Sequence, residues 1–233
     1  MARIVKEQEY AVKRNAILDV AQRLVYTKGY EQMTIQDMLD DLQISKGAFY
    51  HYFDSKQAVL EALIERMQEE VDQLLLSIVQ DPHLPALEKL RRFFPMLARW
   101  KTARKTFILA LLRVWYTDDN ALFRQKLRAT VVKRVTPLLT EIIRQGIQEG
   151  VLTTSYPDQV GEVIVSLVLD LGDTLAWLLL SSEPRRDDVR HIESTVAAYT
   201  DALERALGAP TGSLPLVDAQ TLQEWFVSPG DNT

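Results

Sequence analysis

Apolar residues recur every three to four positions along most of this chain, the spacing that places them on one face of an α-helix. A first stripe predicts an amphipathic helix over residues 9–28, ended by Gly29. A longer one predicts a helix that starts at Ser55 and ends before Pro82. No stretch alternates as a strand would, so the predicted fold class is all-α. Further helices are predicted over residues 85–100, 103–116, 120–149, 158–181 and 187–207, with a short terminal helix that carries Leu222, Trp225 and Phe226.

Two features of this pattern concern the later helices. Pro137 lies inside the predicted helix 120–149 and should kink or divide it, because proline removes a backbone donor and clashes with the preceding turn. Residues 208–215 are rich in glycine and proline and predict a linker. The short helix after it would be marginal alone, so we expect it to dock on the body of the protein.

Three helix-start signals fall close together in the first quarter of the chain, at Thr34, Ser45 and Ser55. Each hydroxyl can accept a hydrogen bond from a free N–H group of a first helical turn, and Asp37 stands where a capping box with Thr34 requires an acid. Only residues 42–44 separate the first two of these helices. A turn of that length joins the paired helices of a helix-turn-helix, so this segment predicts such a unit.

Composition and charge narrow the class of protein. With 233 residues, 47% of them hydrophobic, the chain can bury a substantial core, and the absence of cysteine excludes disulfides and thiolate metal sites. The net charge of −5 disfavours nucleic-acid binding, yet residues 1–56 carry eight Lys or Arg and eight Asp or Glu, so the acidic excess lies elsewhere. Residues 42–53 contain no acid at all, and Lys46 and His51 lie among them.

The longest apolar run, residues 163–180, has the length of a marginal membrane span. Asp170 and Asp173 fall in its middle, where charges would be costly in lipid, so we expect burial between helices or subunits instead. Residues 1–9 are polar and mixed in charge, unlike a secretory signal. We therefore expect a cytoplasmic protein with no membrane association.

Two lysines stand where a bound anion would explain them. Lys46 follows the Ser45 cap and Lys56 follows the Ser55 cap, although a lysine in a first turn opposes the helix dipole. A phosphate could accept hydrogen bonds from the free N–H groups and pair with the ammonium group. Each residue taken singly is more simply an ordinary cap or surface charge, but their combination favours DNA binding.

A set of residues in the first part of the chain carries a family resemblance: Arg14, Ile17, Ala21, Gly29, Thr34, Ser45, Lys46, Gly47, Tyr50, Phe53 and Lys56. The segment resembles the DNA-binding domain of the TetR family of transcriptional regulators, in which the second helix of the pair lies in the major groove. The resemblance implies DNA contacts from Thr34, Ser45, Lys46, Gly47, Tyr50, His51, Tyr52 and Lys56. Within this set, Thr34, Tyr50 and Lys56 resemble phosphate contacts, while Lys46 and His51 are the candidates for base edges.

Three positions depart from the family's pattern. Leu39 replaces the small residue, usually alanine, where the paired helices cross, so we expect the packing there to be adjusted. Gln43 stands where the turn normally has glycine and would be strained in a left-handed conformation. Tyr52 occupies a position that is often histidine.

The rest of the chain resembles the family in architecture. A helix-turn-helix domain over residues 1–56 would precede a helical ligand-binding and dimerisation domain over 57–207, and 208–233 would form the linker and terminal helix. The predicted helices 158–181 and 187–207 would pair with their copies in a homodimer; the alternative is an intrachain core. Core packing also competes with ligand binding for each pocket candidate. These candidates are Phe93, Phe94, Met96, Leu97, Trp100, Phe107, Leu111, Trp115, Tyr116 and Phe123, with Asp170, Asp173 and Trp177 as a face for a cationic ligand.

The sequence thus predicts a dimeric, ligand-responsive repressor that binds a pseudo-palindromic double-stranded DNA operator. The alternative is a constitutive DNA-binding or protein-recruiting module without a small-molecule effector. We expect no cofactor or metal. An enzyme is disfavoured because His51, His83 and His191 are far apart and no phosphate-binding loop, dinucleotide fingerprint or nucleophile elbow is present.

Overall fold

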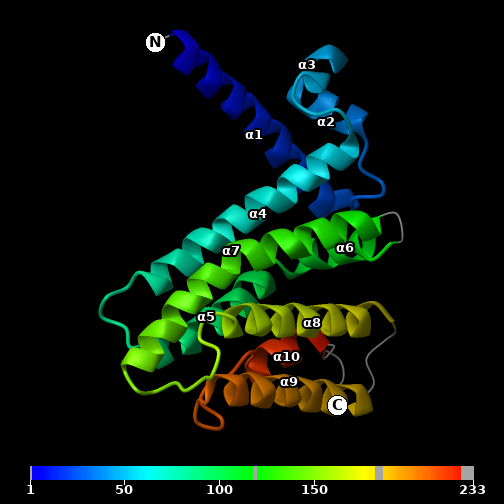
Figure 1. Cartoon of the computed structure of the whole chain (residues 1–233). Coiled ribbons are helices and arrows are strands. Elements are labelled where there is room, and N and C mark those ends of the chain that lie inside the picture. The colour runs from blue at the N-terminus through cyan, green and yellow to red at the C-terminus, as the bar shows by residue number, and fades with distance from the viewer. Residues whose placement is uncertain (1, 118–119, 182–185, 227–233) are drawn as a thin grey trace. The chain divides into compact units, whose positions relative to one another are not determined.

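The computed structural model describes residues 2–117, 120–181 and 186–226. The regular elements in these ranges are helices, and none is a strand, which confirms the predicted all-α fold class (Figure 1). In chain order the α-helices are α1 (Ala2–Lys28), α2 (Ile35–Leu42), α3 (Lys46–Tyr50), α4 (Lys56–Val79), α5 (Ala86–Thr102), α6 (Lys105–Trp115), α7 (Ala121–Gln148), α8 (Val160–Ser181), α9 (Arg186–Leu207) and α10 (Ala219–Phe226).

Helix boundaries agree with the predicted ones to within a few residues, except at the start of the chain. α1 begins at Ala2 instead of residue 9. Its first residues are mostly polar and carry no apolar stripe, but several have good helix propensity. α7 runs unbroken through Pro137, so this proline does not divide the helix, and α5 contains Pro95 in the same way.

The chain divides into two compact units by its internal contacts. Unit 1 comprises Met1–Glu70 and Thr106–Val114, and unit 2 comprises Val71–Lys105 and Trp115–Thr233. Helices α4 and α6 therefore contribute residues to both units. Each unit has its own set of buried apolar side chains.

Unit 1 is a small helical assembly in which α1, α2 and α3 turn apolar side chains inward. Leu39, at the crossing of the paired helices, is buried in this core. The α6 segment adds Phe107, which stacks on Tyr26 of α1 with 5.0 Å between ring centroids. The fully buried side chains of this unit include Ile17, Leu18, Met33, Met38, Phe49, Leu63 and Phe107.

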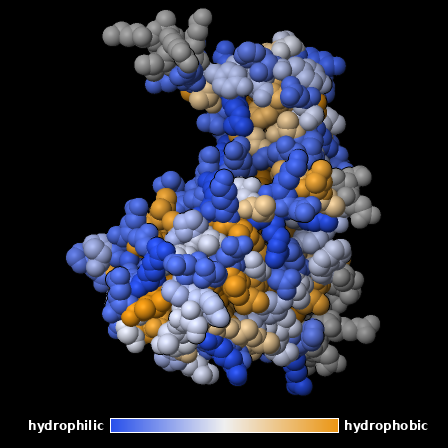
Figure 2. Space-filling model, in the orientation of Figure 1, coloured by the Kyte–Doolittle hydropathy of each residue, from blue (hydrophilic) through white to orange (hydrophobic). Residues whose placement is uncertain are grey.

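Unit 2 is built around α7, which packs on α5 and α8, and α8 packs in turn on α9. Gly161 of α8 lies so close to α7 that an added Cβ would stand 2.4 Å from the Thr140 hydroxyl oxygen. This glycine therefore permits a close approach between two helices of the same chain. Apolar patches also reach the surface among hydrophilic residues on the face of this unit that Figure 2 shows.

Within unit 2, the C-terminal helix packs on the other helices, which agrees with its expected docking. α10 packs on α5 and α9, and Leu222 and Phe226 are buried. The indole N–H of Trp225 donates to the Thr102 hydroxyl at 2.7 Å. Before α10, the buried Glu204 carboxylate accepts hydrogen bonds from two backbone N–H groups of the linker.

α8 is the one helix in the described part of the chain that is long and apolar enough to cross a membrane by length and composition. This is weak evidence, because the core helix of a soluble protein passes the same test. The two acids in its middle are held by protein donors. Asp173 accepts hydrogen bonds from Tyr116 and Arg128, and Asp170 accepts one from the Tyr199 hydroxyl.

Candidate DNA-binding surface

The helix-turn-helix is formed by the hydroxyl caps that its sequence predicted. The Thr34 hydroxyl oxygen accepts a hydrogen bond from the Asp37 N–H at 3.1 Å, and the Asp37 carboxylate accepts one from the Thr34 N–H at 2.9 Å, which completes a capping box. Ser45 caps α3 by accepting from the Ala48 N–H at 3.2 Å. Ser55 likewise accepts a backbone hydrogen bond in the first turn of α4. All three predicted caps are confirmed.

The turn between α2 and α3 keeps a left-handed residue. Gln43 has φ 52° and ψ 41°, and among the described residues no other non-glycine residue has a positive φ. Its N–H and that of Ile44 both donate to the Leu39 carbonyl, which ends α2. Gln43 thus adopts a left-handed conformation that glycine could adopt without strain. This is the conformation in which the sequence predicted that a glutamine would be strained.

Substituting glycine for Gln43 is expected to stabilise the protein by about 1 kcal/mol, because the left-handed strain is larger than the extra chain entropy of glycine. Since Gln43 is exposed, little packing is lost. Urea denaturation followed by circular dichroism measures the difference. Gln43→Ala, which keeps a Cβ in the same conformation, serves as the control and should give no gain. A Gln43→Gly variant no more stable than this control would contradict the strain.

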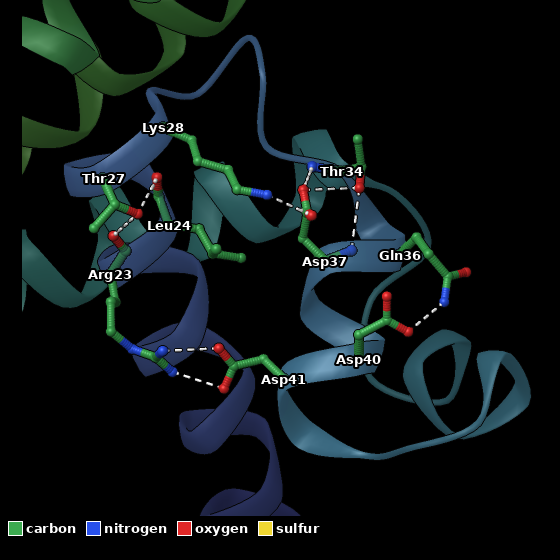
Figure 3. Close-up of polar contacts among 9 residues, drawn as sticks. All are labelled: Arg23, Leu24, Thr27, Lys28, Thr34, Gln36, Asp37, Asp40 and Asp41. Carbon is green, nitrogen blue, oxygen red and sulfur yellow. Dashed lines mark hydrogen bonds and ion pairs between the residues drawn. The ribbon is translucent and has the colours of Figure 1, made fainter.

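Two ion pairs fasten α2 to α1 (Figure 3). Arg23 donates to both carboxylate oxygens of Asp41, at 2.7 and 2.8 Å, and Lys28 donates to Asp37 at 2.6 Å. The Lys28 bond and the Thr34 donors together lower the pKa of Asp37 to about 2. The carboxylate that closes the capping box is therefore also an anchor between the first two helices.

The depressed pKa of Asp37 gives a pH-dependent contribution to stability. The ionised carboxylate stabilises the fold at pH values above its unfolded pKa of about 4, and this stabilisation is lost as the pH falls from there to about 2. The difference in unfolding free energy between wild type and Asp37→Asn should therefore shrink over this window. Removing the largest cause with Lys28→Met should weaken the dependence. A difference that stays constant from pH 6 to about pH 2 would refute the assignment.

α3 turns apolar and polar side chains to opposite sides. Phe49 is fully buried, with Phe53 buried just beyond the helix, whereas Lys46 and Tyr50 are exposed. The Lys46 ammonium lies 5.9 Å from the centre of the Tyr50 ring. Gly47 faces open space, since an added Cβ would meet nothing closer than the Ser45 hydroxyl at 4.0 Å. Packing within the chain therefore does not require glycine here, whereas a close external partner would.

The remaining predicted contact residues border this face. His51 follows α3 and is exposed, and Tyr52 is half-buried. The Lys56 ammonium donates to the Glu31 carbonyl at 3.1 Å and lies 4.3 Å from the centre of the Tyr30 ring. Burial lowers the pKa of Lys56, and the nearby Glu31 carboxylate partly offsets this. Part of the hydrogen-bonding capacity of Lys56 is thus used within the chain.

One residue next to this surface was missed in the sequence. Tyr10 of α1 contacts the rings of His51 and Tyr52. Its position lay at the edge of the predicted first helix, and no local pattern links it to residues so far along the chain. The one available signal was its helical spacing from Arg14 and Ile17, which places it on the same side of α1.

The predicted pocket residues are distributed over both units. Phe107 and Leu111 are buried in unit 1, while the other candidates belong to unit 2. Within unit 2, Phe93 and Phe94 are buried in the core, whereas two ring pairs are less enclosed. These are Trp115 with Phe123, at 5.5 Å, and Tyr116 with Trp177, at 5.0 Å.

The polar groups near these rings are mostly paired. Asp173 accepts from the Tyr116 hydroxyl at 2.6 Å and from Arg128 at 2.9 Å, and burial, followed by Asp173, raises the pKa of Tyr116. The Trp100 ring is covered by the Arg104 guanidinium, and its buried indole N–H finds no acceptor in the described part of the chain. No group of three potential metal ligands is found there either.

A groove of about 520 Å³ runs along α7 and α8. Of the predicted ligand-binding residues, it includes Asp170 alone. Its lining residues are Arg128, Gln159, Glu162, Val163, Ser166, Leu167 and Asp170.

Family models match both units. A model described as bacterial regulatory proteins of the tetR family matches residues 17–63. A second, described as the C-terminal domain of tetracyclin repressor-like proteins, matches residues 113–177. The first covers the helix-turn-helix, and the second covers the end of α6, all of α7 and most of α8.

Proteins with similar sequences are also named as transcriptional regulators. The HTH-type transcriptional repressor NemR of Escherichia coli K12 is 24% identical, over 79% of this chain and 94% of its own. The probable HTH-type transcriptional regulator ArpR of Pseudomonas putida is 27% identical, over 65% and 75%. A TetR-family regulator from Pectobacterium atrosepticum shares the fold, with a TM-score of 0.63 and 20% identity over 87% of this chain and 98% of that one. With both parts matched, this chain belongs to the TetR family of bacterial transcriptional regulators.

Proposed function

We propose that this protein is a ligand-responsive transcriptional repressor that binds a pseudo-palindromic DNA operator as a homodimer. The observation that carries the DNA part is the polar face of α3. Lys46, Tyr50 and His51 are exposed on and just after a short helix whose opposite side is anchored by the fully buried Phe49. No acid lies in residues 42–53, so nothing in this segment repels phosphate.

Individual roles follow from chemistry and position. Thr34, Tyr50 and Lys56 would contact phosphates, because a hydroxyl or an ammonium group can bind there without reading sequence. Lys46 and His51 would contact base edges in the major groove, where a donor distinguishes one base pair from another. The open space over Gly47 supports a close approach of the DNA to the backbone at this point.

The dimer contact is proposed for α8 and α9. Only 22% of the most apolar 18-residue stretch of α8 is buried within the single chain. The side chains of Val163 and Trp177 are 51% and 53% exposed. An exposed apolar helix surface of this kind favours burial against a second copy of the chain. Two recognition surfaces related by a twofold axis would read half-sites separated by about one helical turn of DNA or a multiple of it.

The effector would bind within unit 2, near the aromatic residues of α5 to α8. The buried indole N–H of Trp100, unpaired within the described residues, offers a donor for a ligand acceptor. An effector acts by preferring a conformation whose recognition helices are wrongly spaced for the operator, which shifts the population away from the DNA-binding form.

Selection from random DNA duplexes tests the proposal. The wild-type protein is expected to recover a pseudo-palindromic site, with affinity falling as salt is raised. Tyr50→Ala should weaken binding to all sequences alike, whereas His51→Ala should change the preference at one base pair by about 1–3 kcal/mol. Recovery of no common sequence would refute specific DNA binding, and recovery of a single unpaired half-site would refute the dimeric arrangement.

A constitutive regulator without a small-molecule effector is the second candidate. The pairing of Asp170 and Asp173 with protein donors favours it, because these acids are not free for a cationic ligand. The distinguishing observation is native mass spectrometry of the purified protein, followed by operator-binding assays with any molecule it carries. A co-purified molecule that weakens operator binding supports the first candidate. Unchanged operator affinity with every such molecule supports the second.

A further inference from the structure

Three rings from two distant parts of the chain meet where α3 ends. The Tyr10 ring of α1 lies 5.7 Å from the His51 ring, edge to face at 80°, and 4.8 Å from the Tyr52 ring. The His51 and Tyr52 rings are themselves 5.0 Å apart at 79°. All three residues belong to unit 1. The imidazole is therefore contacted by a phenol from its chain neighbour and by another from a different helix.

α1 is built to hold Tyr10 at this place. The helix extends back to Ala2, so Tyr10 lies well inside it. One turn further along, the Arg14 guanidinium lies 5.2 Å from the centre of the Phe53 ring. The same side of α1 therefore contacts the residues that follow α3 twice, through Tyr10 and through Arg14. Beyond that, Ile17 and Leu18 are fully buried and anchor the helix in the core.

Core packing does not explain Tyr10, since the residue is 40% exposed. An edge-to-face contact does explain its position, because aromatic pairs prefer this geometry at these separations. Such a contact restricts the rotation of His51, an exposed side chain just past the end of a five-residue helix. A side chain that is already oriented loses less conformational freedom when it binds.

We propose that Tyr10 is a positioning residue that orients His51 for readout of one base pair. The sequence preference of the recognition surface then depends on a residue of α1 that itself lies outside the helix-turn-helix. This inference rests on the proposed function, in which His51 contacts a base edge. It adds a specificity-determining position that neither the helix-turn-helix pattern nor the caps indicate.

The test uses the operator selected by the wild-type protein and a panel of single base-pair substitutions in it. Tyr10→Ala should reduce discrimination by about two- to tenfold at the base pair where His51→Ala loses it, with little change in affinity for unrelated DNA. Tyr10→Phe keeps the ring and should behave as wild type. The Tyr10→Ala, His51→Ala double variant should lose no more discrimination than His51→Ala alone, because the two residues act as one unit.

Val12→Ala is the matched control, a substitution on α1 at a residue that is 68% exposed. It should change neither affinity nor preference. A Tyr10→Ala variant that weakens binding to all sequences equally, or that keeps full discrimination at the His51 base pair, would overturn the positioning role. If the wild-type protein selects no operator, the proposed function fails first, and the readout role of Tyr10 fails with it.

Nuclear magnetic resonance of the DNA-free protein tests the contact separately. The His51 ring protons, identified by their loss in His51→Ala, should shift in Tyr10→Ala and stay in place in Val12→Ala, because the neighbouring phenol contributes a ring current. Unchanged His51 resonances in Tyr10→Ala would show that the two rings are not held together in solution.

Discussion

Replacing Phe49 by alanine is expected to destabilise unit 1 by about 3–5 kcal/mol and to abolish operator binding. Phe49 is fully buried in α3, where it contacts the rings of Tyr50 and Phe53 at 5.5 and 6.2 Å between centroids. Removing the ring would leave a cavity beneath the short helix that presents Lys46 and Tyr50. Urea denaturation by circular dichroism measures the stability, and a gel-shift assay with the selected operator measures the binding.

Two variants bracket this result. Phe49→Leu keeps most of the side-chain volume and should cost about 1–2 kcal/mol, with operator binding retained. Val12→Ala, on the exposed side of α1, should change stability by no more than about 0.5 kcal/mol. If Phe49→Ala were as stable as Val12→Ala, the core of unit 1 could not depend on this ring.

Replacing Glu204 by alanine is expected to cost about 2–4 kcal/mol in unit 2. This side chain is 3% exposed, and its two carboxylate oxygens accept hydrogen bonds from the N–H groups of Gly212 and Leu214, both at 2.8 Å. Alanine would leave these donors without an acceptor, and the Leu214 donor is in a buried position. Thermal denaturation measures the loss, and limited proteolysis should show new cleavage between α9 and α10.

Glu204→Gln is the matched control for this change. Its amide oxygen can still accept one of the two hydrogen bonds, so its cost should be about half that of Glu204→Ala. The attachment of the linker also includes the Arg91 guanidinium, which donates to the Ser213 carbonyl at 2.9 Å. Unchanged melting and unchanged protease resistance in Glu204→Ala would mean that this second contact and the packing of α10 suffice.

Most of the fold and part of the candidate site could be predicted from the sequence. The caps at Thr34 and Ser45, the left-handed position at Gln43 and the inward side of α3 all depend on residues within a few positions of one another. The start of α1 could not be placed, because its first residues are mostly polar and show no apolar stripe. Pro137 illustrates the same limit, since a proline that indicates a break in isolation is accommodated within α7.

The sequence could not predict which of the candidate pocket residues lie in the same unit. Phe93 and Phe107 share an aromatic composition and similar helical spacing, yet they are buried in different units. A glycine such as Gly161 permits a close approach between helices, and only the packing identifies its neighbour as Thr140 of the same chain. Periodicity indicates that a residue is buried, but it does not indicate what lies across from it.

The sequence by itself therefore determined most of the helices, their capped starts and the polar residues of α3, because helical periodicity and capping act over about four residues. Tertiary structure alone decided which distant side chains meet. Arg23 reaches Asp41, Glu204 holds the linker, and Tyr10 contacts His51. Such contacts arise from how separate helices pack, and no local pattern records the partner that packing brings to each residue.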